Sequence, residues 1–274
     1  MSVSPTVLAL LVLAALVAGT VDAIAGGGGL ITLPALLAAG LPPHLALGTN
    51  KGQSVWGSGI ATFAFWRAGS LDRKRARLSF PLGLLGSFAG AALVLLVPPA
   101  TLRPLVLILL VAVAIFLTFR KTPPARTEPV PRRAALIRTA LLALVVGTYD
   151  GFFGPGTGTF LILGFVVLLG ETMTRASGDA KVVNFASNLA AVTLFGMRGQ
   201  IAWAIALPMA VGQASGGWIG AHLAVKGGDK MVRRVVLGVM ARGAAHELGG
   251  VHVPGGRQLR FAGEVQERRR HRLR

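Results

Sequence analysis

Hydrophobic residues in this chain gather into long runs that are separated by short polar or basic segments. Three of the longer runs, residues 46–66, 78–97 and 102–119, have about 18–21 residues, the length that one helical crossing of a bilayer requires. We predict the first run to be a retained helix, because residues 1–6 lack the basic residues that open a secretory signal peptide. The predicted membrane helices are residues 5–21, 46–66, 78–97 and 102–119 in the first half, and residues 136–148, 182–197, 201–225 and 231–240 in the second.

Two shorter apolar segments, residues 30–40 and 160–169, interrupt this series. At 1.5 Å per residue, neither can cross about 30 Å of hydrocarbon alone. If they form partial or tilted crossings, each half has an odd number of crossings. If they re-enter the membrane instead, the number is even and the halves run parallel.

The order of segments repeats in the second half, and the repeat is visible in individual residues. Val21–Gly29 aligns with Tyr149–Thr157, and Ala46–Lys51 aligns with Ala176–Lys181. A colinear set of matches indicates an internal repeat. The chain is therefore predicted to contain a first transmembrane repeat (residues 1–120), a cytoplasmic linker (121–135), a second transmembrane repeat (136–240) and a basic tail (241–274).

Composition agrees with a membrane protein. Only 14% of the 274 residues are charged, against about a quarter in soluble domains, and the mean hydropathy is +0.66. The chain has no Cys and five His, which excludes thiolate sites and leaves few ligands for a metal. We therefore predict no metal site and no cofactor.

The net charge of +18 is confined to a few segments. Basic residues cluster at 67–77, 120–138 and 241–274, with long uncharged runs between them. Cytoplasmic loops of multispanning proteins show this pattern, whereas a nucleic-acid interface spreads its charge over one folded face. The predicted partners are the lipid bilayer and a small anionic substrate, and not a nucleic acid.

The basic loops alternate between equivalent positions of the two halves. The loop at 67–77 is rich in Arg and Lys, and its counterpart at 198–202 carries only Arg198. Conversely, the loop at 98–103 carries only Arg103, and its counterpart at 226–234 is strongly basic. Under the positive-inside rule, the two repeats therefore have opposite orientations in the membrane.

A glycine-rich break precedes each short segment. Paired broken helices mark the binding site in many transporters, and the N-terminus of the helix after a break favours an anion. One alternative is a nucleotide loop, but the Walker spacing is missing. Another is close packing of helices at small residues. The candidate binding residues at the breaks are Gly26, Gly27, Gly28, Gly29, Gly154, Gly156, Thr157 and Gly158.

Lys51 and Lys181 begin the next long helix of each half. Because a lysine inside a membrane needs a partner or a water-filled cavity, we predict that the two lysines face each other and bind one anion. The alternatives are that each lysine snorkels to the surface, or forms a salt bridge with Asp22 or Asp150 that only stabilises the fold. The two aspartates are candidates for proton coupling, for helix capping or for neutralising the lysines.

Further polar residues lie in the same two helical segments. They could hydrogen-bond the oxygens of a substrate, or simply hold helices together. These residues are Thr49, Asn50, Gln53 and Ser54 in the first half, and Asn184 and Asn188 in the second.

The motifs carry a family resemblance. Residues 27–51, residues 149–158 and the run from Lys181 to Asn188 resemble the sulfite exporter TauE/SafE family of 4-toluene sulfonate uptake permease-like membrane transporters. The resemblance covers roughly residues 5–240. It implies a multi-pass inner-membrane transporter that is proposed to move organic or inorganic anions containing sulfur.

We therefore predict an all-α, polytopic membrane protein with two homologous halves, arranged as inverted repeats with short helices broken at Gly and Pro. Its predicted function is secondary transport of a small anion by alternating access, with a sulfur oxyanion or organosulfonate as substrate. The alternative is an anion channel that uses the same motifs. An enzyme lacks support, because no metal-ligand cluster and no nucleophile–base pair is evident.

The last predicted crossing departs from the repeat pattern. After residue 240 the apolar run gives way to Arg, Gly and His. We expect a truncated last helix followed by a poorly ordered tail. Two origins remain open: a frameshift, or a genuine basic tail that binds anionic lipid headgroups.

Overall fold

The computed structural model describes the backbone of residues 3–119 and 130–250, and the side chains of residues 3–119 and 130–238. The chain divides into two compact units, residues 1–244 and 245–274. All elements and contacts described below belong to the first unit, apart from the last few helical residues of α9.

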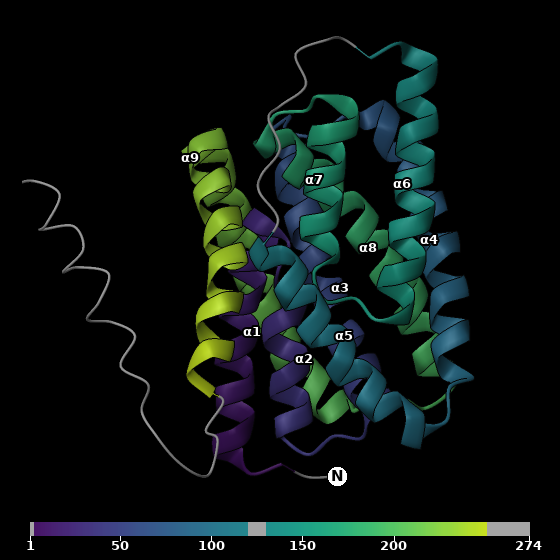
Figure 1. Cartoon of the computed structure of the whole chain (residues 1–274), viewed down its shortest axis with the longest axis vertical. Coiled ribbons are helices and arrows are strands. Elements are labelled where there is room, and N and C mark those ends of the chain that lie inside the picture. The colour runs from purple at the N-terminus through teal and green to yellow at the C-terminus, as the bar shows by residue number, and fades with distance from the viewer. Residues whose placement is uncertain (1–2, 120–129, 251–274) are drawn as a thin grey trace, which may run out of the picture. The chain divides into compact units, whose positions relative to one another are not determined.

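Every regular element in the described ranges is an α-helix (Figure 1). Gly228 has a non-helical backbone (φ 61°, ψ −166°), so α9 consists of two consecutive helices. The first half contains α1 (Pro5–Ala25), α2 (Gly29–Ala38), α3 (Pro43–Arg67), α4 (Arg73–Leu95) and α5 (Pro99–Phe119), and the second contains α6 (Arg132–Phe152), α7 (Thr157–Leu169), α8 (Met173–Met197) and α9 (Trp203–Gly250).

The prediction of an all-α, polytopic membrane protein is confirmed. Five of the described helices, α1, α4, α5, α6 and α8, are long and apolar enough to cross a membrane. The short segments form the separate helices α2 and α7. The structure starts α8 at Met173 and not at Val182, because its first turns contain buried polar residues that the hydrophobic pattern does not register.

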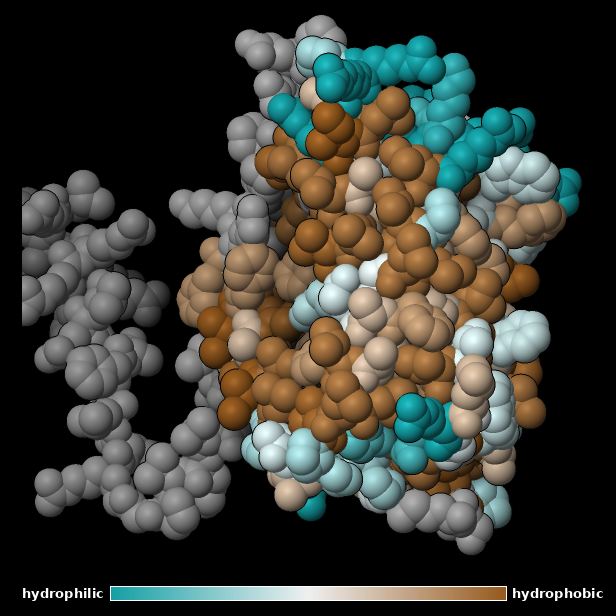
Figure 2. All heavy atoms as spheres, turned by 90° about the vertical axis from the view of Figure 1, so that its right-hand side faces the viewer, coloured by the Kyte–Doolittle hydropathy of each residue, from teal (hydrophilic) through white to brown (hydrophobic). Residues whose placement is uncertain are grey.

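Large apolar side chains cover the outside of this unit. Leu10 and Val17 on α1, Ile108 on α5, and Leu141 and Val145 on α6 are each more than half exposed. Figure 2 shows the resulting apolar band on one face, between hydrophilic groups at its two ends. Exposed apolar surface of this extent is expected where a protein faces lipid.

The helices of the two halves pack on each other through small residues. A Cβ on Gly86 or Gly90 of α4 would collide with the backbone of α6 at Leu144 and Thr148. Gly216 and Gly220 of α9 lie equally close to the backbone of α1 at Leu16 and Thr20. Membrane helices approach closely at such positions. In one interface the glycines belong to the first half, and in the other the equivalent glycines belong to the second half.

Three basic stretches within the described residues, at the starts of α4 and α6 and around Asp229 of α9, lie at one end of the helices. Arg75, at the start of α4, forms an ion pair with Glu171 in the α7–α8 connection. Thr174, at the start of α8, donates its backbone N–H and its hydroxyl to Asp229, at 2.9 and 2.7 Å. Arg138 near the start of α6 donates to the carbonyl oxygen of Leu168 at the end of α7, at 2.7 Å.

The opposite end carries the loops with few charges. His44 at the start of α3 lies 3.1 Å from the carbonyl oxygen of Val94 at the end of α4. Gly48 lies against the backbone of Gln200 in the α8–α9 connection. Figure 1 shows α1 starting at the lower end and α6 starting at the upper end, as inverted halves require.

Capping explains why α4 starts where it does. Asp72 accepts hydrogen bonds from the backbone N–H groups of Lys74 (2.9 Å) and Arg75 (3.1 Å), which the first turn of a helix leaves free. Partial burial acts to raise the pKa of Asp72. These hydrogen bonds and the Arg75 guanidinium outweigh it, so the pKa lies below its usual range.

The C-terminal boundary differs from the sequence-based one. The backbone of α9 stays helical to Gly250, beyond the predicted end of the second repeat at Met240. The predicted tail from residue 251 onward and most of the predicted linker lie outside the described residues.

Candidate functional site

The two glycine-rich segments interrupt the helices as predicted. Gly26 ends α1 in the left-handed conformation (φ 81°), and α2 begins at Gly29. In the second half, Gly154 (φ 99°) and Gly156 (φ 83°) separate α6 from α7. A non-glycine residue is strained in this region of backbone space, so each break depends on its glycines.

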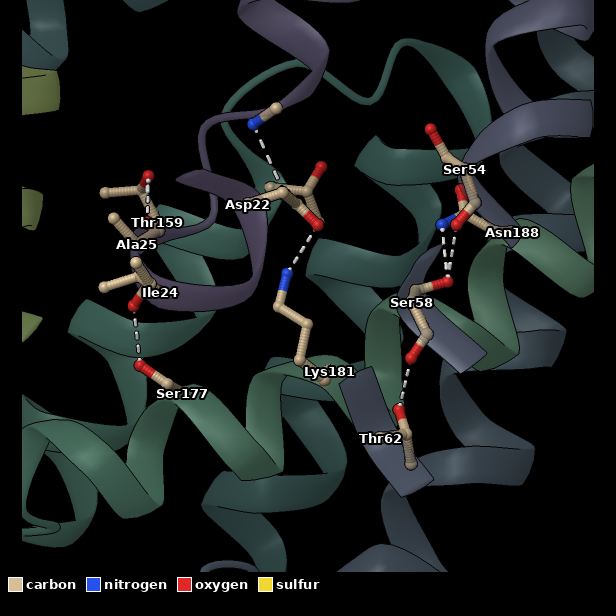
Figure 3. A network of polar contacts seen from close by, with 12 residues as sticks. Asp22, Ile24, Ala25, Ser54, Ser58, Thr62, Thr159, Ser177, Lys181 and Asn188 are labelled. Carbon is tan, nitrogen blue, oxygen red and sulfur yellow. Dashed lines mark hydrogen bonds and ion pairs between the residues drawn. The ribbon is translucent and has the colours of Figure 1, made fainter. Parts of the chain in front are cut away.

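The two breaks touch each other. Gly26 and Gly158 approach so closely that a Cβ on either would collide with the backbone of the other. Thr159 donates its backbone N–H to the carbonyl oxygen of Gly26 (3.2 Å) and its hydroxyl to that of Ala25 (2.8 Å). The end of α1 and the start of α7, far apart in sequence, therefore form one junction (Figure 3).

Neither ammonium group of the two lysines at equivalent repeat positions is free. Lys51 on α3 donates to Asp150 on α6 at 2.7 Å, and the two side chains are 3% and 6% exposed. Lys181 on α8 donates to Asp22 on α1, also at 2.7 Å, and Lys181 is fully buried. Figure 3 shows the second pair. Each lysine therefore forms a salt bridge in this structure, and neither snorkels to the surface.

Both ion pairs join one half of the chain to the other. The first-half lysine pairs with the second-half aspartate, and the second-half lysine pairs with the first-half aspartate. A similar exchange relates two backbone contacts. Asp179 accepts from the backbone N–H of Asp72 (2.8 Å), and Thr49 accepts from that of Ala202 (3.0 Å).

The glycine breaks also contact the carboxylates. The backbone N–H of Gly28 donates to Asp22 at 3.3 Å. The hydroxyl of Thr157 lies 2.9 Å from Asp150 and 2.6 Å from the carbonyl oxygen of Gly154. Donors at the helix breaks, which were predicted to hold an anion, thus contact carboxylates of the protein itself.

A small polar cavity lies between the ion pairs. Its volume is about 30 Å³, which is room for about one or two water molecules. Its lining contains most of the predicted site residues. The complete lining consists of Asp22, Gly26, Gly29, Asn50, Lys51, Ser54, Asp150, Gly154, Thr157, Gly158, Asn184, Asn188 and Gln213.

Some predicted residues lie outside this lining. Lys181 does not line the cavity, but it pairs with Asp22, which does. Gly28 also lies outside the lining and donates its backbone N–H to the same carboxylate. Thr49 bonds the α8–α9 connection. Gly156 lies against Val113 of α5. Gly27 is buried, but it does not line the cavity.

The site contains one residue that the sequence interpretation missed. Gln213 of α9 is 2% exposed and lines the cavity. It stands in the otherwise apolar predicted segment 201–225, and an isolated amide within a membrane helix is a usable signal. Ser54 was noted as polar, and the structure places it in the lining.

Amide and hydroxyl groups complete the cavity walls. Asn50 accepts from Thr32 at 2.6 Å and from Gln53 at 3.1 Å. Asn188 donates to Ser58 at 3.2 Å, which links α8 to α3. These contacts hold helices together. The Asn184 side-chain oxygen is buried and has no hydrogen-bond partner within the described part of the chain, so it is available to a ligand or water.

The site combines paired charges with a very small cavity. Two ammonium groups and two carboxylates balance one another, and the cavity admits little more than water. In the described ranges, no group of three or more His, Asp or Glu residues is arranged to hold a metal ion. The fold and site define a polytopic helical membrane protein with two buried ion pairs beside a polar cavity.

Comparison with known proteins identifies the family. The profile described as "Sulfite exporter TauE/SafE" matches residues 11–246, and the chain belongs to this family. No solved structure matches the chain.

Several curated relatives cover most of their own length in the match. A probable membrane transporter protein, ORF9, of Sinorhizobium sp. is 38% identical over 84% of this chain and 88% of its own. The probable membrane transporter protein YfcA of Escherichia coli K12 is 40% identical over 87% and 88%. A probable membrane transporter protein of Haemophilus influenzae is 38% identical over 86% and 92%.

Proposed function

We propose that this protein is a secondary transporter that carries a small anion across the inner membrane by alternating access. The proposed substrate is a sulfur-containing oxyanion or an organosulfonate. The main support is the pair of exchanged ion pairs beside a buried polar cavity. Intramembrane ionisable groups of this kind mark substrate or ion pathways, and the family description names a sulfur oxyanion.

In the proposed mechanism, the anion replaces the carboxylates as the partner of the lysines. Lys51 already has Asp150 as its partner, so an anion can bind it only when that carboxylate withdraws or accepts a proton. The same holds for Lys181 and Asp22. Of these two possibilities, the proposal adopts protonation: Asp22 and Asp150 accept protons when the anion binds, which gives them the role of coupling residues.

The proposed movement separates the two halves at their shared contacts. Each ion pair joins helices from different halves, so opening the cavity breaks contacts that belong to neither half alone. We propose that the halves are inverted repeats. The exchanged contacts and the gathering of basic segments at one end support this relation. In such transporters, access alternates as one repeat moves against the other.

Uptake of labelled sulfite into proteoliposomes tests the function, with sulfate and small sulfonates as competitors. We expect saturable uptake that is accelerated by unlabelled anion on the opposite side. Lys51→Ala and Lys181→Ala should each lower uptake about 10- to 100-fold, the effect of losing a charged hydrogen bond to the ligand. Lys74→Ala, which removes an exposed lysine, is the matched control and should retain uptake.

The other outcomes separate the competing mechanisms. Flux that neither saturates nor shows exchange would favour an anion channel. Asp150→Asn should abolish any acceleration by a pH gradient if that carboxylate carries a coupling proton. Uptake that survives both lysine substitutions would remove the lysines from the anion site and contradict the mechanism.

A further inference from the structure

A second hollow lies away from the buried site, at the basic end of the helices. It has a volume of about 540 Å³, within the range of small-molecule pockets. Its residues come from α3, the α3–α4 connection, the first turns of α4, and α8. They are Thr62, Trp66, Leu71, Arg73, Ala76, Arg77, Phe80, Pro81 and Val182. We call it the Arg73 groove.

The walls of the Arg73 groove are mainly apolar, and its rim is basic. Arg73 and Arg77 are one turn apart on α4, and both are exposed. The Arg73 guanidinium lies 5.6 Å from the centre of the Trp66 ring. Stacking on an aromatic face leaves the edge of a guanidinium free to bind an oxyanion.

The neighbouring carboxylates do not neutralise this rim. Asp72 and Glu171 form ion pairs with Arg75, and Asp179 lies 3.8 Å from the same guanidinium. Within residues 3–119 and 130–238, no ion pair involves Arg73 or Arg77. Among the described residues, the groove therefore presents two positive charges without an ion-pair partner beside an apolar hollow.

The position of the groove indicates what kind of molecule fills it. It lies where α3 ends and α4 begins, among the basic segments that the positive-inside rule assigns to the cytoplasmic face. Trp66 is 46% exposed, and tryptophan is enriched at the level of lipid headgroups. The aligned positions of the second half, Trp203 and Leu207, carry no charge. The basic rim is thus specific to this face.

We propose that the Arg73 groove binds an anionic glycerophospholipid. The phosphate contacts Arg73 and Arg77, and an acyl chain lies against the apolar wall formed by Leu71, Phe80 and Val182. Arginine forks suit phosphate oxygens, and basic pockets between membrane helices bind acidic lipid headgroups. A free phosphate would fill only the rim and would leave the apolar wall uncovered.

Binding of lipids to the full-length protein in a neutral detergent tests the proposal. Native mass spectrometry would count bound phosphatidylglycerol, phosphatidylcholine and sn-glycerol 3-phosphate over a concentration series. We expect saturable binding of phosphatidylglycerol in preference to phosphatidylcholine, and no comparable binding of glycerol phosphate. Equal binding of both lipids, or tight binding of glycerol phosphate, would overturn the proposal.

A pair of charge-matched variants separates the groove from general electrostatic attraction. Arg73→Gln/Arg77→Gln should weaken phosphatidylglycerol binding about tenfold or more. Arg67→Gln/Lys74→Gln removes the same charge from the same basic segment, at residues that do not line the groove, and should change binding less than about twofold. Equal losses in both variants would contradict a specific site.

Two further measurements keep the result interpretable. The thermal unfolding midpoint of each variant in detergent without lipid should match the parent protein, which shows that the fold is intact. Arg103→Gln changes the single arginine of a separate apolar groove between the end of α2 and α5, and it should leave phosphatidylglycerol binding unchanged. The lipid assay does not depend on transport, so its failure would leave the proposed function untouched.

Discussion

Lys51 and Lys181 are buried inside α3 and α8, and each contacts one carboxylate at 2.7 Å. A buried ion pair is weak evidence for stability, because the cost of removing both charges from water offsets their attraction. Removing one partner of such a pair is strongly destabilising, because the remaining charge is then buried without a partner. The proposed transport mechanism gives these two pairs a role that needs exchangeable charges.

We predict that the Lys51–Asp150 pair behaves as a unit in unfolding experiments. Lys51→Ala and Asp150→Ala should each lower the free energy of unfolding by about 3–5 kcal/mol, because each leaves one uncompensated buried charge. The double variant should lose clearly less than the sum. Thermal or denaturant unfolding in detergent measures this, and additive losses would show that the two side chains are not coupled.

At the scale of elements, the broken helices are the feature that creates the site. α1 and α7 meet at Gly26 and Gly158. At the start of α2 the backbone N–H of Gly28 donates to Asp22, and at the start of α7 the Thr157 hydroxyl contacts Asp150. Continuous helices could not do this, because their amides would be bonded within the helix. The irregular backbone is tolerated at this depth because it lines a polar cavity.

Two alanine substitutions should separate backbone strain from collision at this junction. Gly26 (φ 81°) and Gly40 (φ 87°) both have left-handed backbones, so Gly26→Ala and Gly40→Ala each cost about 1–2 kcal/mol. A Cβ on Gly40 meets open space, whereas one on Gly26 collides with the backbone of Gly158.

Gly26→Ala should therefore lose at least about 2 kcal/mol more than Gly40→Ala, or fail to accumulate in the membrane. The unfolding midpoint and the folded yield after purification would measure the difference. Equal effects of the two substitutions would mean that the contact between the breaks is not close.

At the scale of the whole molecule, contacts between the halves occur in pairs, and the two halves swap positions between the members of each pair. α4 packs on α6 and α9 packs on α1 through equivalent glycines, and the two ion pairs follow the same exchange. Three basic segments lie at one end, near the α7–α8 connection and the end of α7. Together these features favour inverted halves with one cytoplasmic end.

Single cysteines at equivalent loop positions should therefore react from opposite sides of the membrane. The chain has no cysteine, so there is no background. Ala68 and Arg198 are both exposed and align with each other in the two halves. A membrane-impermeant maleimide should label Arg198→Cys in intact cells, and Ala68→Cys only after permeabilisation.

Lys226→Cys provides the control, because residue 226 is exposed and lies in the basic loop at 226–234. It should behave like Ala68→Cys. Labelling of the Ala68 and Arg198 variants from the same side would contradict inverted repeats and would favour parallel halves.

Much of the architecture could be predicted from the sequence alone. Long apolar runs specify membrane helices because the requirement is local: enough consecutive apolar residues to match the hydrocarbon thickness. The glycine-rich segments at 26–29 and 154–158 likewise predicted the breaks, because the effect of glycine on the backbone is local. Helix starts were predicted less well where polar residues are buried, as at Met173, because hydropathy cannot register a polar residue whose partners are distant.

The sequence by itself thus determined the membrane-helix segments, the breaks, the family and most residues of the cavity lining. Only the tertiary structure decided that each lysine pairs with the aspartate of the other half, 99 and 159 positions away. It also decided that Gln213 joins the cavity and that Thr49 and Gly156 do not. Such contacts depend on the rotation and mutual approach of helices, which no local pattern of residues specifies.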